Sequence, residues 1–318
     1  MKAAVLDRLG AVPRWTEFDE PKIGPGELRI EMIAAAVKPL ERSLATPGHY
    51  ASHRTFPVVV GTDGIGRGPD GRVVYISRPR SPFGTLAEAT VADSARAVPV
   101  PSGVDPAEAA ALVNPGLSSW LSLSERARLT PGESVLVIGA TGTAGGLAGP
   151  IAKILGAGPV LGAARRPEAI DPGGFDRAFP IAGEAALSVE GWADLLREYG
   201  VTIILDYLGG EAAGAVLEAI GRTDRWPPGP ARVRYVQIGQ SGGATARLPL
   251  GMLRSRWIDL LGFGLGTLPD ARTIQTAVTR LLEQRRDGRL HRPVRRFAPE
   301  EIEAAWAAPG FPRPVVVF

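Results

Sequence analysis

The stretch SVLVIGATGTAGGLAGPIAKILGAGPVLGAARRPE, at residues 134–168, decides the fold of this chain. A predicted buried strand at 134–140, SVLVIGA, leads into a loop with the G-x-G-x-x-G spacing, in which alanine takes the first position. A helical segment and a second apolar run at 159–164 follow. Strand, loop, helix and strand in this order form the context that a dinucleotide-binding unit requires. The stretch therefore predicts such a unit; the alternative is a glycine-rich turn in an unrelated α/β protein.

The residues of this loop have separate tasks. Gly142 would let the backbone approach a pyrophosphate, and Gly145 would let the helix pack closely on the strand. The helix N-terminus would offer N–H groups and a partial positive charge to the phosphates. Pro150 lies inside the expected helix and predicts a kink or an opened turn there. The predicted cofactor-binding residues of the loop are Ala140, Thr141, Gly142, Thr143, Ala144 and Gly145.

The end of the second apolar run indicates which cofactor is bound. Proteins that bind NAD commonly place an acidic residue there, which holds the ribose 2′-hydroxyl. In this chain Arg165 and Arg166 stand at that place, and the first carboxylate is Glu168. Arginines form charge-assisted hydrogen bonds with a 2′-phosphate. The pair therefore favours NADPH over NADH, although two arginines on an exposed loop would look the same in the sequence.

The pattern of the sequence changes near residue 116. Before it, short apolar or alternating runs are separated by turn residues; after it, strands alternate with helices, which is typical of a parallel, doubly wound sheet. We expect a strand-rich domain at 1–115 and a dinucleotide-binding domain at 116–263. Strand content returns near the C-terminus, so we expect 264–318 to fold back onto the first domain.

Two local patterns in the first part of the chain lead to further predictions. The stretch from Gly64 to Gly71 contains four glycines and predicts a turn. The segment DPAEAAALV at 105–113 predicts a helix, with Asp105 as its cap and proline in its first turn.

Composition excludes several classes of function. Of the 318 residues 45% are hydrophobic and 22% are charged, and the net charge is +3 with Lys and Arg dispersed. This profile suits a globular protein rather than one that binds nucleic acid. The absence of cysteine and the presence of only three histidines argue against a metal site, because a catalytic zinc usually takes three protein ligands. No signal peptide and no apolar run of about 18 residues are present, so we expect a cytoplasmic protein without membrane contact.

Several segments, taken in their order, resemble one family. PGELRIEMIAAAVKPLE resembles an early strand and turn of the medium-chain dehydrogenase/reductase superfamily, and PVVVGTDGIG resembles its glycine-rich stretch. The segment GTLAEATVADSARAVPVPSGVDPAEAAAL, the phosphate loop, ILDYLGG and RYVQIGQ follow in the family's order. The chain is similar to the zinc-free quinone oxidoreductase-like branch over nearly its whole length.

This resemblance implies an α/β protein with a Rossmann doubly wound parallel sheet and a strand-rich, GroES-like catalytic domain. It implies hydride transfer from NADPH to a quinone, or to the β-carbon of an enone or enoyl thioester, in a cleft between the domains. The implied partners are a small-molecule substrate and a second copy of the chain in a homodimer, with no nucleic acid and no membrane.

Family positions carry over residue by residue. Tyr50, in the segment PGHY, matches a tyrosine proposed as a proton donor in enoyl reductase relatives; packing at a loop edge is the alternative. Asn114 matches a position that lines the nicotinamide pocket. The positions that match residues flanking the nicotinamide and its carboxamide are Gly239, Gln240, Phe263 and Gly264.

Departures from the family affect the expected substrate more than the cofactor. Lys38 occupies a turn position where the family has asparagine. It could stabilise an enolate or bind an acidic substrate, or it could be a solvated lysine on a loop rim. Ala178–Ile181 replaces a segment that usually holds a tyrosine near the adenosine phosphate. The family's usual Gly-Lys before the final strand is replaced here by residues 310–314, in which Arg313 would keep the positive charge near the cofactor.

Three functions therefore compete. The first is an NADPH-dependent, zinc-independent reductase of a quinone or an enone, with Tyr50, Lys38 and Asn114 as candidate catalytic residues. The second is a biosynthetic reductase that acts on a polyketide-like intermediate. The third is a redox sensor that binds NADPH and performs little catalysis.

Overall fold

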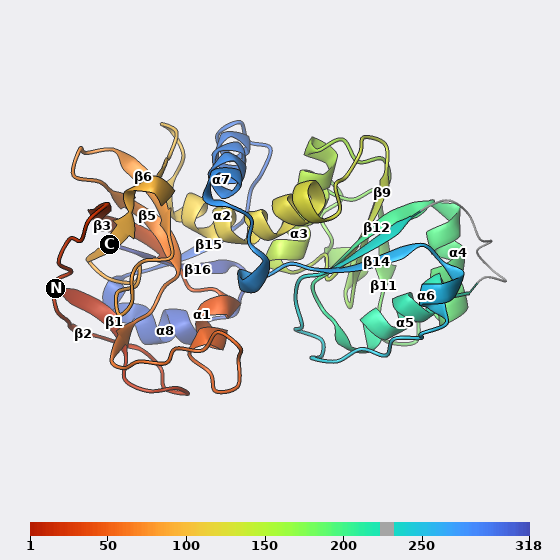
Figure 1. The fold of residues 1–318 in the computed structure, drawn as a ribbon, viewed down its shortest axis with the longest axis horizontal. Helices are drawn as coiled ribbons and strands as arrows, with labels where there is room; N and C mark the ends of the chain where they lie inside the picture. The colour runs from red at the N-terminus through yellow and green to blue at the C-terminus, as the bar shows by residue number, and fades with distance from the viewer. Residues whose placement is uncertain (223–231) are drawn as a thin grey trace. The chain divides into compact units, whose positions relative to one another are not determined.

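The computed structural model describes residues 1–222 and 232–318 (Figure 1). The chain divides into two compact units, which are described separately: Met1–Asn114 with Asp270–Phe318, and Pro115–Pro269. The first unit is rich in antiparallel strands, and the second contains a parallel sheet. These sheets confirm the predicted α/β class.

Two sheets form the first unit. Their strand orders are β2-β1-β4 and β15-β16-β3-β5-β6-β8, with β7 paired to β3 as well. The strands are β1 (Lys2–Leu6), β2 (Arg14–Glu17), β3 (Glu27–Ala36), β4 (Val58–Val59), β5 (Asp63–Arg67), β6 (Val73–Ser77), β7 (Ala89–Asp93), β8 (Val98–Pro99), β15 (Val294–Phe297) and β16 (Arg313–Val317). The helices are α1 (Pro39–Leu44), the first part of α2 (Pro106–Leu121), α7 (Ala271–Arg286) and α8 (Ile302–Ala307).

The C-terminal strand completes the larger sheet of the first unit. β16 pairs antiparallel with β3, with Val316 opposite Ala35. Both strands are largely buried in this part, so the pairing places a continuous apolar layer between the sheet and α8. The last residues of the chain therefore belong to the same core as residues near position 35.

The predicted turn from Gly64 to Gly71 is wrong in its first half, because residues 63–67 form β5. This strand lies beside β3, and its glycines permit the close approach. A Cβ on Gly64 would lie 2.8 Å from the Ala34 carbonyl oxygen, and one on Gly66 would lie 2.6 Å from that of Glu31. The glycines of this stretch mark a close backbone contact rather than a bend.

The second unit contains one parallel sheet with the strand order β11-β10-β9-β12-β13-β14. The strands are β9 (Ser134–Ile138), β10 (Val160–Ala164), β11 (Arg177–Pro180), β12 (Val201–Asp206), β13 (Val233–Gln237) and β14 (Ile258–Gly262). The helices are the second part of α2, α3 (Thr143–Ile154), α4 (Val189–Glu198), α5 (Gly210–Ile220) and α6 (Met252–Ser255). Figure 1 shows α3 on one side of the sheet and α4 to α6 on the other.

The central strands of this sheet are buried on both faces. Every residue of β9 and β10 is buried, which explains why these segments are continuous apolar or small-residue runs without alternation. Trp192 of α4 packs with Leu136 and Ile204 in the core on one face. The two-sided burial holds the ends of these strands, where the site lies, in fixed positions.

Two helices continue through prolines. The helix predicted at 105–113 extends through Pro115 to Leu121 and ends in a π-helical turn at Ser122–Arg126. α3 likewise remains helical through Pro150, so the predicted opened turn is wrong. Gly174 faces the Pro150 ring, and a Cβ there would lie 2.6 Å from the ring's Cδ. The missing side chain at residue 174 leaves room for the proline.

Candidate functional site

The loop between β9 and α3 turns sharply at the end of a buried strand. Gly139 has a φ of +96°, and Gly142 is the N-cap of α3. A Cβ on Gly145 would lie 2.3 Å from the Gly139 carbonyl oxygen, so only glycine lets α3 approach the strand this closely. A Cβ on Gly142 would lie 3.3 Å from the same oxygen. A strict need for glycine at 142 would therefore come from a ligand rather than from the fold.

Other predicted cofactor residues lie along the same edge of the sheet. Gly239 and Gln240 follow β13, and Phe263 and Gly264 follow β14. The strand order reverses direction between β9 and β12, and dinucleotides bind outside the carboxyl ends of the strands at such a switch point. Gln240 is exposed, whereas the Phe263 side chain is buried. Phe263 can therefore shape this edge but offers a ligand little side-chain surface.

Two arginines follow the carboxyl end of β10. Arg165 and Arg166 are both exposed, and neither guanidinium has an ion-pair partner among the described residues. Both arginines lie on the side of β9 opposite to β12, because β10 flanks β9 on that side. Unpaired guanidinium groups at this strand end fit a phosphate on the ribose of a dinucleotide. The residues of this unit therefore suit NADPH.

A buried aspartate at the end of β12 organises the neighbouring loop, and the sequence did not single it out. Asp206 accepts hydrogen bonds from the backbone N–H of Leu208 at 2.8 Å and of Gly209 at 3.0 Å. Its second oxygen accepts from the Tyr235 hydroxyl at 2.7 Å. Burial raises the pKa of Asp206, and these donors oppose that effect. An acidic residue directly after a buried strand, in ILDYLGG, was the signal available in the sequence.

Tyr207, the next residue, points its hydroxyl toward α2. The phenol oxygen lies 2.7 Å from Oγ of Ser119, and Ser119 Oγ lies 3.2 Å from the carbonyl oxygen of Ala144. The end of β12 is thus linked to the first turn of α3. Neither Ser119 nor Tyr207 was among the residues predicted from the sequence.

In the first unit, Lys38 is buried between two carboxylates. Its Nζ lies 2.8 Å from Glu41 Oε1 and 2.8 Å from Asp63 Oδ1, and it donates to the Ala36 carbonyl oxygen at 3.4 Å. Only 2% of the residue is exposed, so the solvated-lysine alternative is wrong. Burial lowers the pKa of Lys38, but attraction to Asp63 and Glu41 outweighs it and raises the pKa overall. All three ammonium hydrogens have acceptors, which favours a positioning role over direct contact with a substrate.

Arg313 lies in the same buried region. Its Nη1 donates to the Val37 carbonyl oxygen at 3.4 Å, and burial lowers its pKa to about 10. Glu41 and Asp63 attract it, so two cations and two carboxylates share this interior. The predicted role of Arg313 in cofactor binding remains a prediction, and burial of its guanidinium does not favour it.

Tyr50 and Asn114 have different surroundings. Tyr50 lies in the loop after α1, with 68% of the residue exposed and its ring 4.4 Å from that of His49. Its hydroxyl is therefore accessible to a substrate. Asn114 is half-buried within α2 and is the last residue of the first segment of the first unit. Their catalytic roles remain predictions.

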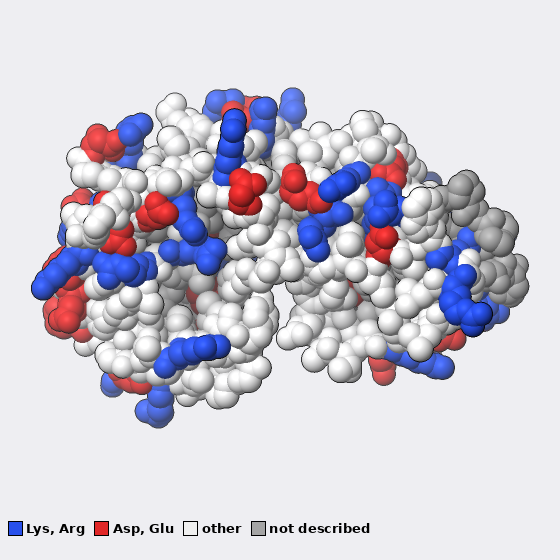
Figure 2. Space-filling view, in the orientation of Figure 1, with Lys and Arg blue, Asp and Glu red and all other residues white. Residues whose placement is uncertain are grey.

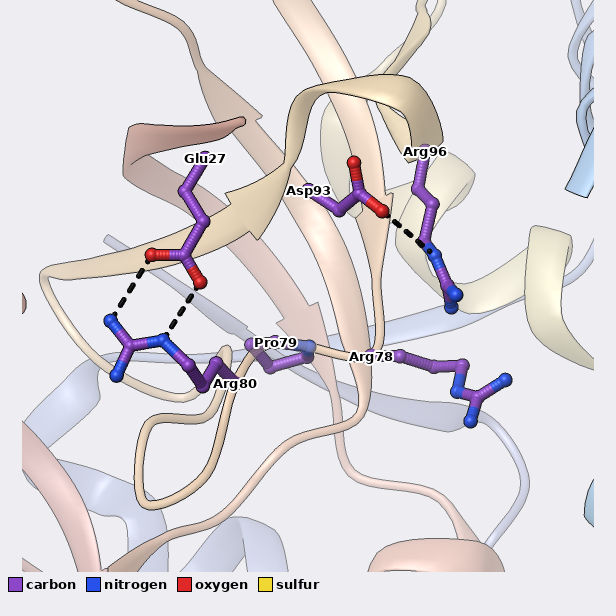
Figure 3. Close-up of a pocket in the computed structure, with 6 residues that line it drawn as sticks. All are labelled: Glu27, Arg78, Pro79, Arg80, Asp93 and Arg96. Carbon is purple, nitrogen blue, oxygen red and sulfur yellow. Dashed lines mark hydrogen bonds and ion pairs between the residues drawn. The ribbon is translucent and has the colours of Figure 1, made fainter. Parts of the chain in front are cut away.

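A shallow hollow on the first unit is lined by Glu27, Arg78, Pro79, Arg80, Asp93 and Arg96 (Figure 3). Its charges are largely paired: Arg80 Nε lies 2.8 Å from Glu27 Oε1, and Arg96 Nε lies 3.3 Å from Asp93 Oδ2. No aromatic or aliphatic wall faces it, and pockets for flat conjugated molecules are mostly apolar. This hollow is not where we place the substrate.

Comparison with known proteins identifies the family. No family model matches the chain. The chain is 30% identical over 266 residues to a protein of Emericella nidulans named a probable NADPH-dependent quinone reductase, a match that covers 71% of this chain and 72% of that protein. The chain belongs to the zinc-free quinone oxidoreductase-like branch of the medium-chain dehydrogenase/reductase superfamily. The resemblance drawn from the sequence segments is confirmed.

Solved structures agree with this assignment. The quinone oxidoreductase of Thermus thermophilus, solved alone and with NADPH, is 28% identical and superimposes with a TM-score of 0.80 over all of both chains. The NADPH complex of the Escherichia coli quinone oxidoreductase is 18% identical with a TM-score of 0.81 over all of both chains, which shows the shared fold. The Rossmann and GroES-like architecture of the family is therefore confirmed.

A second group of relatives is much longer. A mycocerosic acid synthase-like polyketide synthase of Mycobacterium tuberculosis is 29% identical over 237 residues, which are 70% of this chain and 10% of the synthase. This quinone oxidoreductase-like protein thus resembles a small part of a biosynthetic assembly line as well as free-standing reductases.

Surface and metal features complete the description. Figure 2 shows positive and negative side chains interspersed on the face drawn, without one large patch of a single sign. Within residues 1–222 and 232–318, no helix is long and apolar enough to cross a membrane. No group of three His, Asp or Glu side chains in these ranges is placed to hold a metal ion.

Proposed function

We propose that this quinone oxidoreductase-like protein transfers hydride from NADPH to a quinone or an α,β-unsaturated carbonyl compound, without zinc. The observation that carries the cofactor part is the pair of exposed guanidinium groups of Arg165 and Arg166, which have no ion-pair partner in residues 1–222 and 232–318 and follow a glycine loop that fits a pyrophosphate. The relatives named as NADPH-dependent or solved with NADPH support the same cofactor.

Each part of the chain has a task in this proposal. The Ala140–Gly145 loop holds the pyrophosphate at the N-terminus of α3, and the two arginines hold the 2′-phosphate. When bound, NADPH supplies a hydride to the acceptor. An enone then carries negative charge on its oxygen, and a proton must reach its α-carbon. Tyr50, with its exposed hydroxyl, is the candidate donor of that proton, and Asn114 is the candidate contact to the nicotinamide pocket.

The buried Lys38 acts through position rather than through contact. Its ion pairs join the turn before α1 to the start of β5, and α1 leads into the Tyr50 loop. The side chain therefore fixes the base of the loop that carries the candidate donor.

The second candidate function is reduction of an enoyl thioester in the synthesis of a polyketide-like compound. The similarity to one segment of polyketide synthases favours it. Hydride transfer to the β-carbon is the same for an enone and an enoyl thioester, so these two substrate classes differ only in the group attached to the conjugated carbonyl.

Steady-state NADPH oxidation with quinones, simple enones and enoyl thioesters tests the proposed function. We expect Tyr50→Phe to lower kcat for enones by about 100-fold, because protonation at carbon needs a positioned acid. We expect a smaller loss with quinones, because the hydroquinone oxygens exchange protons with water directly. Tyr199→Phe, in a tyrosine beside Phe179 in the second unit, serves as the control.

Three outcomes are decisive in this experiment. Turnover restricted to enoyl thioesters would favour the biosynthetic function over quinone reduction. Tight NADPH binding without turnover of any acceptor would contradict the proposed enzyme and favour a redox sensor. An unchanged kcat for enones in Tyr50→Phe would reject the tyrosine as the acid.

A further inference from the structure

The hydroxyl of Tyr207 belongs to a short chain of hydrogen bonds at the end of β12. Tyr207 Oη lies 2.7 Å from Ser119 Oγ, which lies 3.2 Å from the Ala144 carbonyl oxygen. Ser119 is fully buried and Tyr207 is half-buried. The hydrogen bonds connect the phenol of this half-buried tyrosine to the phosphate loop through one enclosed serine.

The direction of these hydrogen bonds follows from counting protons. Both contacts of Ser119 can be hydrogen bonds at the same time only if Ser119 donates its single hydroxyl proton to Ala144, because a carbonyl oxygen can only accept. The contact between Ser119 and Tyr207 then requires the phenol to donate to Ser119. The neighbouring Ser118 also has its proton committed, to the Pro115 carbonyl oxygen at 2.7 Å. Tyr207 therefore has no proton left for a ligand and presents only its lone pairs.

The ionisation of the phenol agrees with this count. Burial raises the pKa of Tyr207 to about 12, although its hydrogen bond with Ser119 acts in the opposite direction. At neutral pH the oxygen is a neutral acceptor that neither carries a charge nor readily gives up its proton.

The sheet order indicates which half of a dinucleotide faces this oxygen. A bound pyrophosphate would lie at the N-terminus of α3, and the two halves of the dinucleotide would extend over opposite halves of the sheet. Arg165 follows β10, so the adenosine half belongs on the β10 side. The nicotinamide half would then extend over the carboxyl end of β12, which Tyr207 follows directly.

We propose that Tyr207 binds the nicotinamide half of NADPH by accepting a hydrogen bond from the carboxamide N–H₂ group. This inference rests on the proposed use of NADPH and adds a specific contact to it. The carboxamide amino group is a donor without acceptor capacity, which complements an oxygen that can only accept. The contact fixes the rotation of the nicotinamide ring about its long axis and so contributes to which face of the ring meets the substrate.

Equilibrium binding of two oxidised cofactors tests this contact. One is NADP⁺, and the other is its 3-acetylpyridine analogue, in which a methyl group replaces the carboxamide amino group. We expect Tyr207→Phe to raise the Kd for NADP⁺ about three- to tenfold, which corresponds to the net free energy of one hydrogen bond. The same variant should change the Kd for the analogue by less than about twofold. Tyr199→Phe should change neither Kd.

Ser119→Ala gives an independent measurement without removing the phenol. Loss of the serine hydroxyl frees the Tyr207 proton, so the phenol can donate to a ligand. The Kd for NADP⁺ should therefore rise relative to the Kd for the analogue. Equal weakening of both ligands by Tyr207→Phe, or no weakening of either, would overturn the contact while leaving NADPH binding intact. Failure of the unmodified protein to bind NADP⁺ would instead overturn the proposed cofactor, and this contact with it.

Discussion

Gly145→Ala is expected to raise the Kd for NADPH by about 10- to 100-fold, the value of one charge-assisted hydrogen bond or more. The new Cβ would lie 2.3 Å from the Gly139 carbonyl oxygen, so α3 must move away from β9. That movement withdraws the helix N-terminus from the phosphates. Overpacking should also lower the free energy of unfolding by about 1–3 kcal/mol. Titration with NADPH and chemical denaturation measure the two effects.

Gly142→Ala is the matched control for this prediction. Gly142 has a φ of −68°, which alanine adopts readily, and its added Cβ would lie 3.3 Å from the same carbonyl oxygen. We expect this variant to keep its stability but to bind NADPH more weakly, because the methyl group occupies the approach to the pyrophosphate. Normal NADPH affinity in Gly145→Ala, or equal losses of stability in the two variants, would contradict this account of the loop.

Lys38→Met is expected to lower the free energy of unfolding by about 3–5 kcal/mol, the usual effect of removing one partner from a buried ion pair. Glu41 and Asp63 would remain in the interior with Arg313 as their remaining buried cation. The comparison is with Lys22→Met, because Lys22 is exposed and its replacement should change stability by less than about 0.5 kcal/mol. Chemical denaturation of both variants measures the difference.

The contribution of these ion pairs depends on pH in a defined direction. The folded-state pKa of Lys38 is raised, so its contribution to stability is fully present below the usual lysine pKa of 10.5 and is lost as the pH rises through the folded-state pKa. Burial raises the pKa of Glu41, but attraction to Lys38 outweighs it and lowers the pKa overall, so that contribution is lost as the pH falls below 4.5. A loss of stability in Lys38→Met that is small at neutral pH would contradict the stabilising role of the buried ion pairs of Lys38 with Glu41 and Asp63.

The parallel sheet could be predicted because its signals are local. The stretches 135–138 and 203–205 are wholly apolar, as a strand that is buried on both faces requires. β5 could not be predicted in the same way. Gly64 and Gly66 are turn residues by composition, and only the close approach of β3 explains them.

The candidate site shows the same contrast. The phosphate loop and the arginines after β10 are continuous in the sequence, so they could be identified directly. The partners of Lys38 come from two separate segments, and the link from Ser119 to Tyr207 spans 88 positions. Such contacts depend on tertiary packing, which a single sequence does not display. The family position of Lys38 suggested a catalytic contact, whereas its burial favours a positioning role.

The most direct test of the central claim compares kcat/KM for NADPH and NADH, with one quinone acceptor, in the unmodified protein and in Arg165→Ala. Arg177→Ala is the control, because this exposed arginine lies at the amino end of the neighbouring β11. The account predicts a preference for NADPH of at least about tenfold, which Arg165→Ala reduces by about tenfold and Arg177→Ala leaves unchanged. Equal use of NADH by the unmodified protein, or an unchanged preference in Arg165→Ala, would contradict it.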